Sequence, residues 1–159
     1  MINDNFALTG ALTISLNNEV VQKTKNLVVT DGKNWVASRL KDTGTSPTHT
    51  IKAEMSHMAI GTDTTTIAAA PVIAAHTALV TELDRNVLTV DGGTVSGASI
   101  EYACTWAAGD GTGAITEAGI FNHATAGHAD EDMFARTKFA VVNKGALDSM
   151  TITWTITVS

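Results

Sequence analysis

The carboxyl-terminal residues alternate strictly between apolar side chains and threonines, and this pattern constrains the fold more than any other feature of the sequence. Apolar residues stand at positions 150, 152, 154, 156 and 158, and threonines stand at the four positions between them. Because successive side chains of a strand point to opposite faces of its sheet, one face here is apolar and the other carries hydroxyl groups. The pattern is typical of an antiparallel sheet with one face on a core and the other in water.

The same period of two indicates further strands. Residues 100–106 alternate in this way, as do residues 12–16 near the amino end. The asparagine pair at positions 17 and 18 favours a tight turn, and residues 20–25 continue as an extended segment, which together predict a hairpin. The remaining strands are predicted at residues 55–60, 86–90, 115–121 and 133–139.

Two short helices are expected among the strands. Asp31 is placed to cap the first, which would carry Trp35, Val36 and Leu40 on one side. The second is predicted at residues 77–83.

The sequence therefore predicts a mainly β protein, an antiparallel β-sandwich or jelly-roll-like domain with one or two short helices. The domain would span residues 26–159, preceded at residues 1–25 by an amino-terminal arm or a first hairpin.

Charge and composition exclude some partners. The 159 residues carry a formal net charge of -6, which argues against direct binding of nucleic acid or of an anionic membrane surface. Charged residues make up 16% of the chain, below the average of about 25%, while threonine and alanine occur 25 and 23 times. A surface so poor in charge is suited to lie against other protein, although threonine also favours sheets for stability alone.

No constellation of residues indicates catalysis. The glycine-rich segment 109–113 precedes a predicted strand rather than a helix, so it is expected to be a hairpin turn and not a phosphate cradle. Cys104 lies in an alternating strand and is expected to be a small core residue. We expect no enzymatic activity, no catalytic residue, no cofactor and no metal.

One loop nevertheless gathers groups that could bind a cation. His123, His128, Asp130, Glu131 and Asp132 lie between two predicted strands. Without a helix to fix the spacing of the two histidines, a preorganised zinc site is not indicated. The loop is interpreted as a solvated acidic segment, with a cation site or a glycan contact left open.

The amino-terminal residues are the candidate interaction segment. The apolar side chains there could add a strand to the sheet edge of another chain, or could form an ordinary first strand in the protein's own core. These residues are Phe6, Leu8, Leu12, Ile14 and Leu16.

Several segments together resemble one group of known proteins. They include a His-x-Ala-x-Gly-Thr segment at residues 57–62 and a Thr-x-Leu-x-x-Glu-x-x-Arg segment at residues 77–85. In order along the chain, the matching segments are residues 26–40, 57–62, 77–85, 115–122, 134–137 and 151–156. The chain thereby resembles a family of small virion structural proteins of tailed bacteriophages. The likeness covers about residues 26–158 and departs from the family pattern at residues 127–132.

The resemblance implies a non-enzymatic component of the phage particle, made in the host cytoplasm. The leading expectation is a capsid decoration, or cement, protein that binds the lattice of the major capsid protein on the outer head surface, as a homotrimer. Because no long shaft or repeat is present, a fibre is less favoured. The alternatives are a tail or tail-fibre-associated adaptor and, less favoured, a glycan-binding host-recognition module using residues 42–57 and 123–132.

Overall fold

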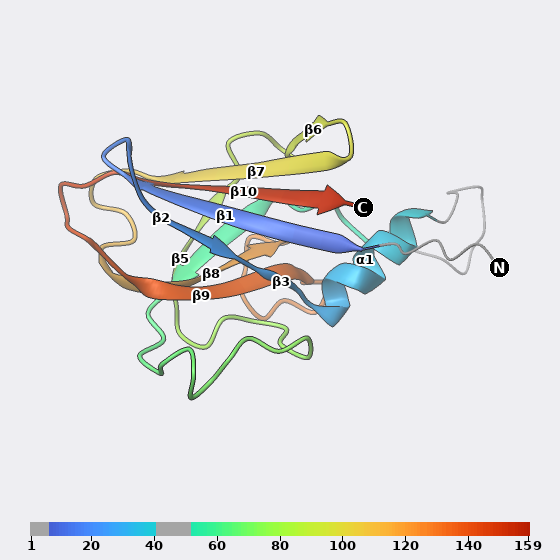
Figure 1. Ribbon diagram of the computed structural model, residues 1–159, viewed down its shortest axis with the longest axis horizontal. Coiled ribbons are helices and arrows are strands. Elements are labelled where there is room, and N and C mark those ends of the chain that lie inside the picture. Colours follow the sequence, from blue (N-terminus) through green and yellow to red (C-terminus); the bar gives the residue numbers. More distant parts are fainter. Residues whose placement is uncertain (1–6, 41–51) are drawn as a thin grey trace.

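Two antiparallel sheets pack face to face in the computed structural model, which describes residues 7–40 and 52–159 (Figure 1). Each sheet has five strands, and one short helix, α1 (Thr30–Leu40), stands at one end of the sandwich. The predicted β-sandwich is therefore confirmed. No helix in the described part of the chain is both long and apolar enough to cross a membrane.

The first sheet, here called sheet A, is built around the threonine-rich strand. That strand, β10, pairs on one side with β1 and on the other with β7. In spatial order, the strands are β2 (Glu19–Lys25), β1 (Leu8–Leu16), β10 (Met150–Val158), β7 (Ser99–Trp106) and β6 (Thr94–Ser96). Since β1 and β2 belong to this sheet, the segment before residue 26 is part of the sandwich from residue 8 onward.

The second sheet, sheet B, carries most of the protein's buried charges. Its two longest strands, β8 and β9, form the centre of the sheet, and β4 pairs with the other side of β8. In spatial order, the strands are β3 (Leu27–Val28), β9 (Met133–Lys144), β8 (Gly113–Phe121), β4 (His57–Gly61) and β5 (Glu82–Val87).

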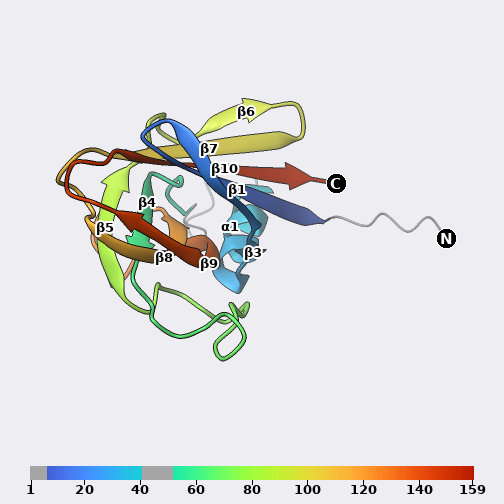
Figure 2. The same ribbon diagram turned by 60° about the vertical axis from the view of Figure 1, so that its left-hand side comes forward.

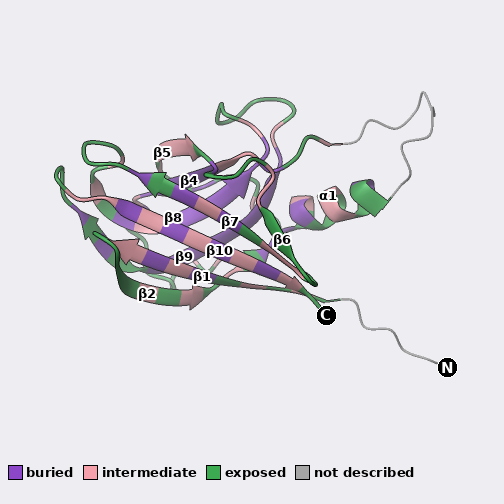
Figure 3. Cartoon of the chain, turned by 90° about the horizontal axis from the view of Figure 1, so that it is seen from above, coloured by how far each residue is buried: buried purple, intermediate pink, exposed green. Residues whose placement is uncertain are grey.

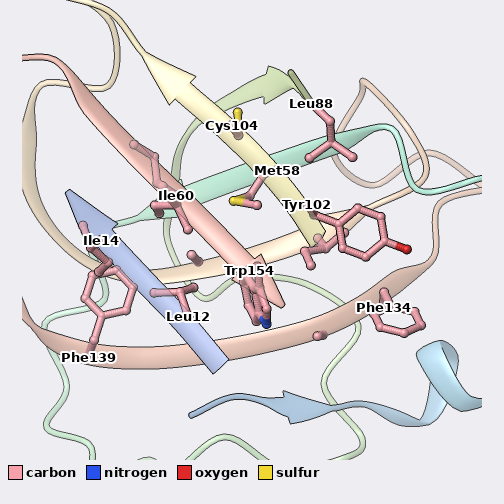
Figure 4. Close-up of a cluster of buried hydrophobic side chains, with 14 of the residues drawn as sticks. Leu12, Ile14, Met58, Ile60, Leu88, Tyr102, Cys104, Phe134, Phe139 and Trp154 are labelled. Carbon is pink, nitrogen blue, oxygen red and sulfur yellow. The ribbon is translucent and has the colours of Figure 1, made fainter. Parts of the chain in front are cut away.

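The apolar faces of the two sheets enclose one main core (Figure 4). Trp106 and Trp154 are fully buried in it, whereas Trp35 of α1 packs edge-on against Phe134 at a ring separation of 5.6 Å. Cys104 is fully buried, and burial raises the pKa of its thiol to about 12. The burial of Cys104 confirms the prediction that it is a core residue. A thiol with such a pKa is also not reactive near neutral pH.

The predicted turns and most predicted strands are present. Asn17 and Asn18 both have positive φ angles, 49° and 68°, as the tight turn between β1 and β2 requires. Gly109 and Gly111 also have positive φ angles, as expected of a turn. The predicted hairpin was wrong, however, because β7 belongs to sheet A and β8 to sheet B, so this turn connects the two sheets.

The second predicted helix was wrong. Residues 77–81 form no regular element, and β5 occupies Glu82–Val87, earlier than the strand expected at 86–90. The backbone amides of Val80 and Thr81 donate hydrogen bonds to the Glu117 carboxylate, although in a helix the Thr81 amide would have bonded to the Thr77 carbonyl. A long-range contact therefore overrides the local helix signal.

Candidate functional site

The outer face of sheet A, which points away from the core, is broad and carries more hydroxyl groups than charges. On β10 it carries four threonines of intermediate exposure, which alternate with fully buried or nearly buried core residues (Figure 3). The strand register places Lys23, Lys25 and Glu101 as charged side chains on this face, opposite Thr13, Ala11 and Thr155. Its strand-borne hydroxyl groups come from Thr9, Thr13, Ser15, Thr94, Ser96, Ser99, Thr105, Thr151, Thr153, Thr155 and Thr157.

Some of these hydroxyl groups already satisfy one another. Ser99 Oγ lies 2.8 Å from Thr157 Oγ1, and Thr105 Oγ1 lies 2.9 Å from Thr151 Oγ1, both across the β7–β10 pair. A partner that covered these pairs would leave neither hydroxyl without a hydrogen bond, so the desolvation cost would be small. This face can therefore be covered by protein more cheaply than a charged surface.

The outer face of sheet B is different, because ionised side chains lie buried on it. Arg136 on β9 is 1% exposed and Glu117 on β8 is fully buried. The Arg136 Nη2 atom lies 2.5 Å from Glu117 Oε2, and Nε of the same guanidinium donates to that oxygen at 3.1 Å. A buried pair of this kind is stable only when both partners are present.

Residues 62–81 form the cover over this pair. They lie on the side of sheet B away from sheet A in both Figure 1 and Figure 2. Glu117 accepts hydrogen bonds from the amides of Val80 and Thr81 at 3.2 and 2.9 Å. Lys138 donates to the Thr65 carbonyl and hydroxyl oxygens at 2.9 and 2.7 Å, so charges on β8 and β9 hold both ends of the cover.

Asp63 completes this cluster. Its Oδ2 atom lies 2.7 Å from Lys138 Nζ and 3.6 Å from Arg136 Nη2. Burial alone would raise the pKa of Asp63, but the hydrogen bonds from Lys138 and Thr65 outweigh burial and lower it to about 2. The carboxylate thus stabilises the fold above its ordinary pKa, and this contribution is lost as pH falls toward 2.

His76 is the side chain in this cover whose ordinary pKa, 6.5, lies nearest neutral pH. The Arg136 guanidinium donates to His76 Nδ1 at 2.7 Å, which requires that nitrogen to be unprotonated. Burial lowers the pKa of His76, Arg136 and Lys138 lower it further, and Glu117 opposes them. The imidazole is therefore a neutral acceptor within the cluster.

A second ionic cluster holds the loop that contains the candidate cation ligands. Arg85 on β5 bonds Glu82 at 2.9 and 2.8 Å and Glu131 at 3.3 Å, and donates to the His123 carbonyl at 2.7 Å. Its guanidinium also lies over the Phe121 ring, 3.9 Å from the centroid. The loop is thereby attached to the outer face of sheet B.

The description of this loop as solvated was wrong for two of its acidic residues. The side chains of Glu131 and Asp132 are only 6% and 10% exposed; Glu131 pairs with Arg85, and Asp132 pairs with Lys52. Asp130, in contrast, is 89% exposed. The sequence could not show these partners, because Arg85 and Lys52 are distant along the chain.

The two histidines of this loop do lie together. The His123 and His128 rings stack with centroids 3.8 Å apart. Among the described residues, however, no group of three His, Cys, Asp or Glu side chains is arranged to hold a metal ion.

The structure also locates the amino-terminal interaction residues. Leu12 and Ile14 are fully buried in the main core, while Leu8 and Leu16 pack partly against it. In this single chain, Leu12 and Ile14 are thus core residues of a strand flanked by β2 and β10. Phe6 lies outside the described residues.

The charged residues of these two clusters were not identified from the sequence as a site. A signal for them existed, because Glu117, Arg136 and Lys138 lie among mostly apolar residues in the two strands. Charges at such positions indicate that another segment covers the sheet.

No family model, no curated protein and no solved structure matches this chain.

Proposed function

We propose that this chain is a structural protein of a tailed-bacteriophage virion and that it decorates the outer surface of the head by docking the outer face of sheet A. The resemblance of residues 26–158 to small virion proteins supports the first part of the proposal. The observation that carries the second part is the contrast in charge between the two outer faces. The buried charged side chains on the outer face of sheet B form ion pairs within the chain, whereas the outer face of sheet A presents hydroxyl groups and few charges.

A face of this composition suits repeated, individually modest contacts. Stable interfaces bury about 1,600 Å² in total, and a decorated shell repeats one contact at many equivalent positions. When subunits also contact one another, binding at neighbouring positions adds through avidity. The sheet therefore needs shape and low desolvation cost more than a few strong ion pairs.

Co-sedimentation with expanded empty heads, assembled from the capsid protein of the same genome, tests the proposal. Thr153 lies at the centre of the face, between Thr13 and Ala103 in the strand register. A Thr153→Arg substitution should weaken binding about tenfold or more, because it buries an unpaired charge in the interface. Thr112→Arg, at an exposed position in the β7–β8 turn, is the matched control and should bind like the wild type.

Two results would contradict the proposal. Wild-type protein that does not sediment with heads but binds purified tails would make the chain a tail adaptor instead. Head binding by Thr153→Arg that equals that of the wild type would show that the outer face of sheet A is not the docking face. Equal unfolding midpoints of the variants and the wild type verify that the fold is unchanged.

A further inference from the structure

A groove of about 520 Å³ lies between the start of β1, strand β3 and helix α1. Its walls are mostly apolar, formed by Leu8, Leu27, Val36, Ala37 and Leu40. Leu27 is 36% exposed and Leu40 is 79% exposed, so large apolar side chains at this site face water. Among the described residues that line it, Lys33 is the single charged one. The groove can therefore bind apolar side chains and offers one cation to the occupant.

The backbone along one side of the groove has no strand partner. Ala7 exchanges two hydrogen bonds with Ser159, 2.7 and 3.0 Å long, so its amide and carbonyl point toward β10. The amide and carbonyl of Leu8 consequently point to the opposite edge. On that edge the pairing with β2 begins only at Ala11, and Asn26 N donates to Gly10 O at 3.3 Å. Within the described residues, no strand pairs with this edge at Leu8.

A polar side chain beside the groove also has no hydrogen bond within the described part of the chain. Both the oxygen and the nitrogen of the Asn26 side-chain amide are buried, and neither has a hydrogen-bond partner among the described residues. The amide packs against Gly10, where a Cβ atom would lie 1.6 Å from Asn26 Oδ1. A buried amide without hydrogen bonds costs about 1–3 kcal/mol, and because both atoms are closed off from solvent, a peptide in the groove can pair with them only after this side chain turns toward it.

We propose that this groove binds residues 1–6 of a neighbouring copy of the chain as an added strand on the free edge of β1. Residue 7 lines the groove, so the described chain begins at the mouth of the site. In an extended segment Ile2, Asp4 and Phe6 share one face. Ile2 and Phe6 match the apolar walls, and Asp4 between them matches Lys33.

The occupant comes from a neighbour and not from the same chain for a geometric reason. Ala7 continues the direction of β1 beside Ser159. To pair with the edge of its own β1, the segment would have to reverse direction within six residues. The turn would consume the middle of the segment, so Ile2 and Phe6 could not both enter the groove. A segment from another copy enters at full length.

Complementation between two full-length variants tests this directly. Ile2→Ser combined with Phe6→Ser produces a chain that accepts but cannot donate. Ala37→Arg, at an exposed helix position that lines the groove, produces a chain that donates but cannot accept. By analytical ultracentrifugation, each variant alone should be monomeric, an equal mixture should form a 1:1 heterodimer, and the wild type should be oligomeric. Asn34→Arg, an exposed control on the same helix that does not line the groove, should associate like the wild type.

Charge reversal sharpens the assignment of Asp4. Asp4→Lys and Lys33→Asp should each weaken association about tenfold, and the chain carrying both changes should recover most of the loss. A monomeric wild type, a mixture that forms no heterodimer, or a double reversal no better than the single changes would overturn the proposal. The outcome does not depend on the virion proposal, because self-association is measured on the purified chain without heads.

Discussion

The two outer faces of this sandwich differ in what covers them. On sheet B, residues 62–81 and the loop around Glu131 lie over buried arginines, whereas the outer face of sheet A carries alternating threonines of intermediate exposure along β10. Covering a sheet within one chain here requires specific ion pairs that hold irregular segments in place. The outer face of sheet A shows the opposite chemistry, which is hydroxyl groups that desolvate cheaply.

The largest loss of stability is expected when the cation at the centre of the covered face is removed. Arg136→Met keeps much of the side-chain volume but leaves Glu117 buried without its counter-charge. We expect a loss of about 3–5 kcal/mol in the free energy of unfolding, measured by urea denaturation. Residues 62–81 should also become sensitive to limited proteolysis. The reason is that Arg136 fixes the Glu117 carboxylate, whose oxygens accept the hydrogen bonds from the amides of Val80 and Thr81.

Adding Glu117→Gln to Arg136→Met separates charge from packing. The double variant has no uncompensated buried charge, so it should recover part of the lost free energy. A single variant that loses less than about 1 kcal/mol would contradict the view that this ion pair holds the cover.

A smaller effect is expected from crowding the start of the cover. A Cβ atom on Gly61 would lie 2.5 Å from the Thr81 carbonyl oxygen and 2.6 Å from Glu117 Oε1. Gly61→Ala should therefore push the cover from the sheet and cost about 1–3 kcal/mol by the same denaturation experiment. If Gly61→Ala were neutral, the close approach at this site would be refuted.

The sequence predicted the open face far better than the covered one. The alternation at residues 150–158 follows from the local geometry of a strand, so the pattern determines both the element and its two faces. The hydrogen bonds of Glu117 join residues that are at most 37 positions apart along the chain. They nevertheless depend on how an irregular segment folds over the sheet. Local patterns do not contain that information, and the helix wrongly expected at residues 77–83 is the result.

The candidate interaction site was predicted only in part. The amino-terminal residues were selected for their alternation, but Leu12 and Ile14 of that set are core residues in this chain. The groove near Leu8 could not be predicted, because it depends on where α1 ends relative to β1. Asn26 gave no signal either, since its lack of hydrogen bonds is a property of the packed structure.

Acid should weaken the covered face by a smaller amount than the loss of Arg136. The folded-state pKa of His76 is lowered from 6.5 by burial and by the neighbouring Arg136, so the unfolded chain binds more protons below this pH. The free energy of unfolding should therefore be highest above pH 6.5 and fall as pH decreases through the lowered pKa. Protonation also places a cation beside Arg136 and Lys138, with only Glu117 and Asp63 to compensate.

Comparing urea denaturation at about pH 7.5 and about pH 5.5 measures this effect. His57 also has a lowered pKa, caused by burial and by Arg85, and contributes in the same direction. His76→Gln should therefore reduce the pH dependence without abolishing it. An unchanged slope in this variant would exclude His76 as a contributor.

The smallest effect is expected on the open face, and it completes the comparison. Thr153 has intermediate exposure, and none of the side-chain hydrogen bonds found among the described residues uses its hydroxyl. Thr153→Ala should change the free energy of unfolding by no more than about 0.5 kcal/mol. Thr151→Val, which removes the hydroxyl paired with Thr105, should cost at most about 1 kcal/mol. Losses as large as that of Arg136→Met would mean that these threonines hold the sandwich together, and the alternation on β10 would then need no partner to explain it.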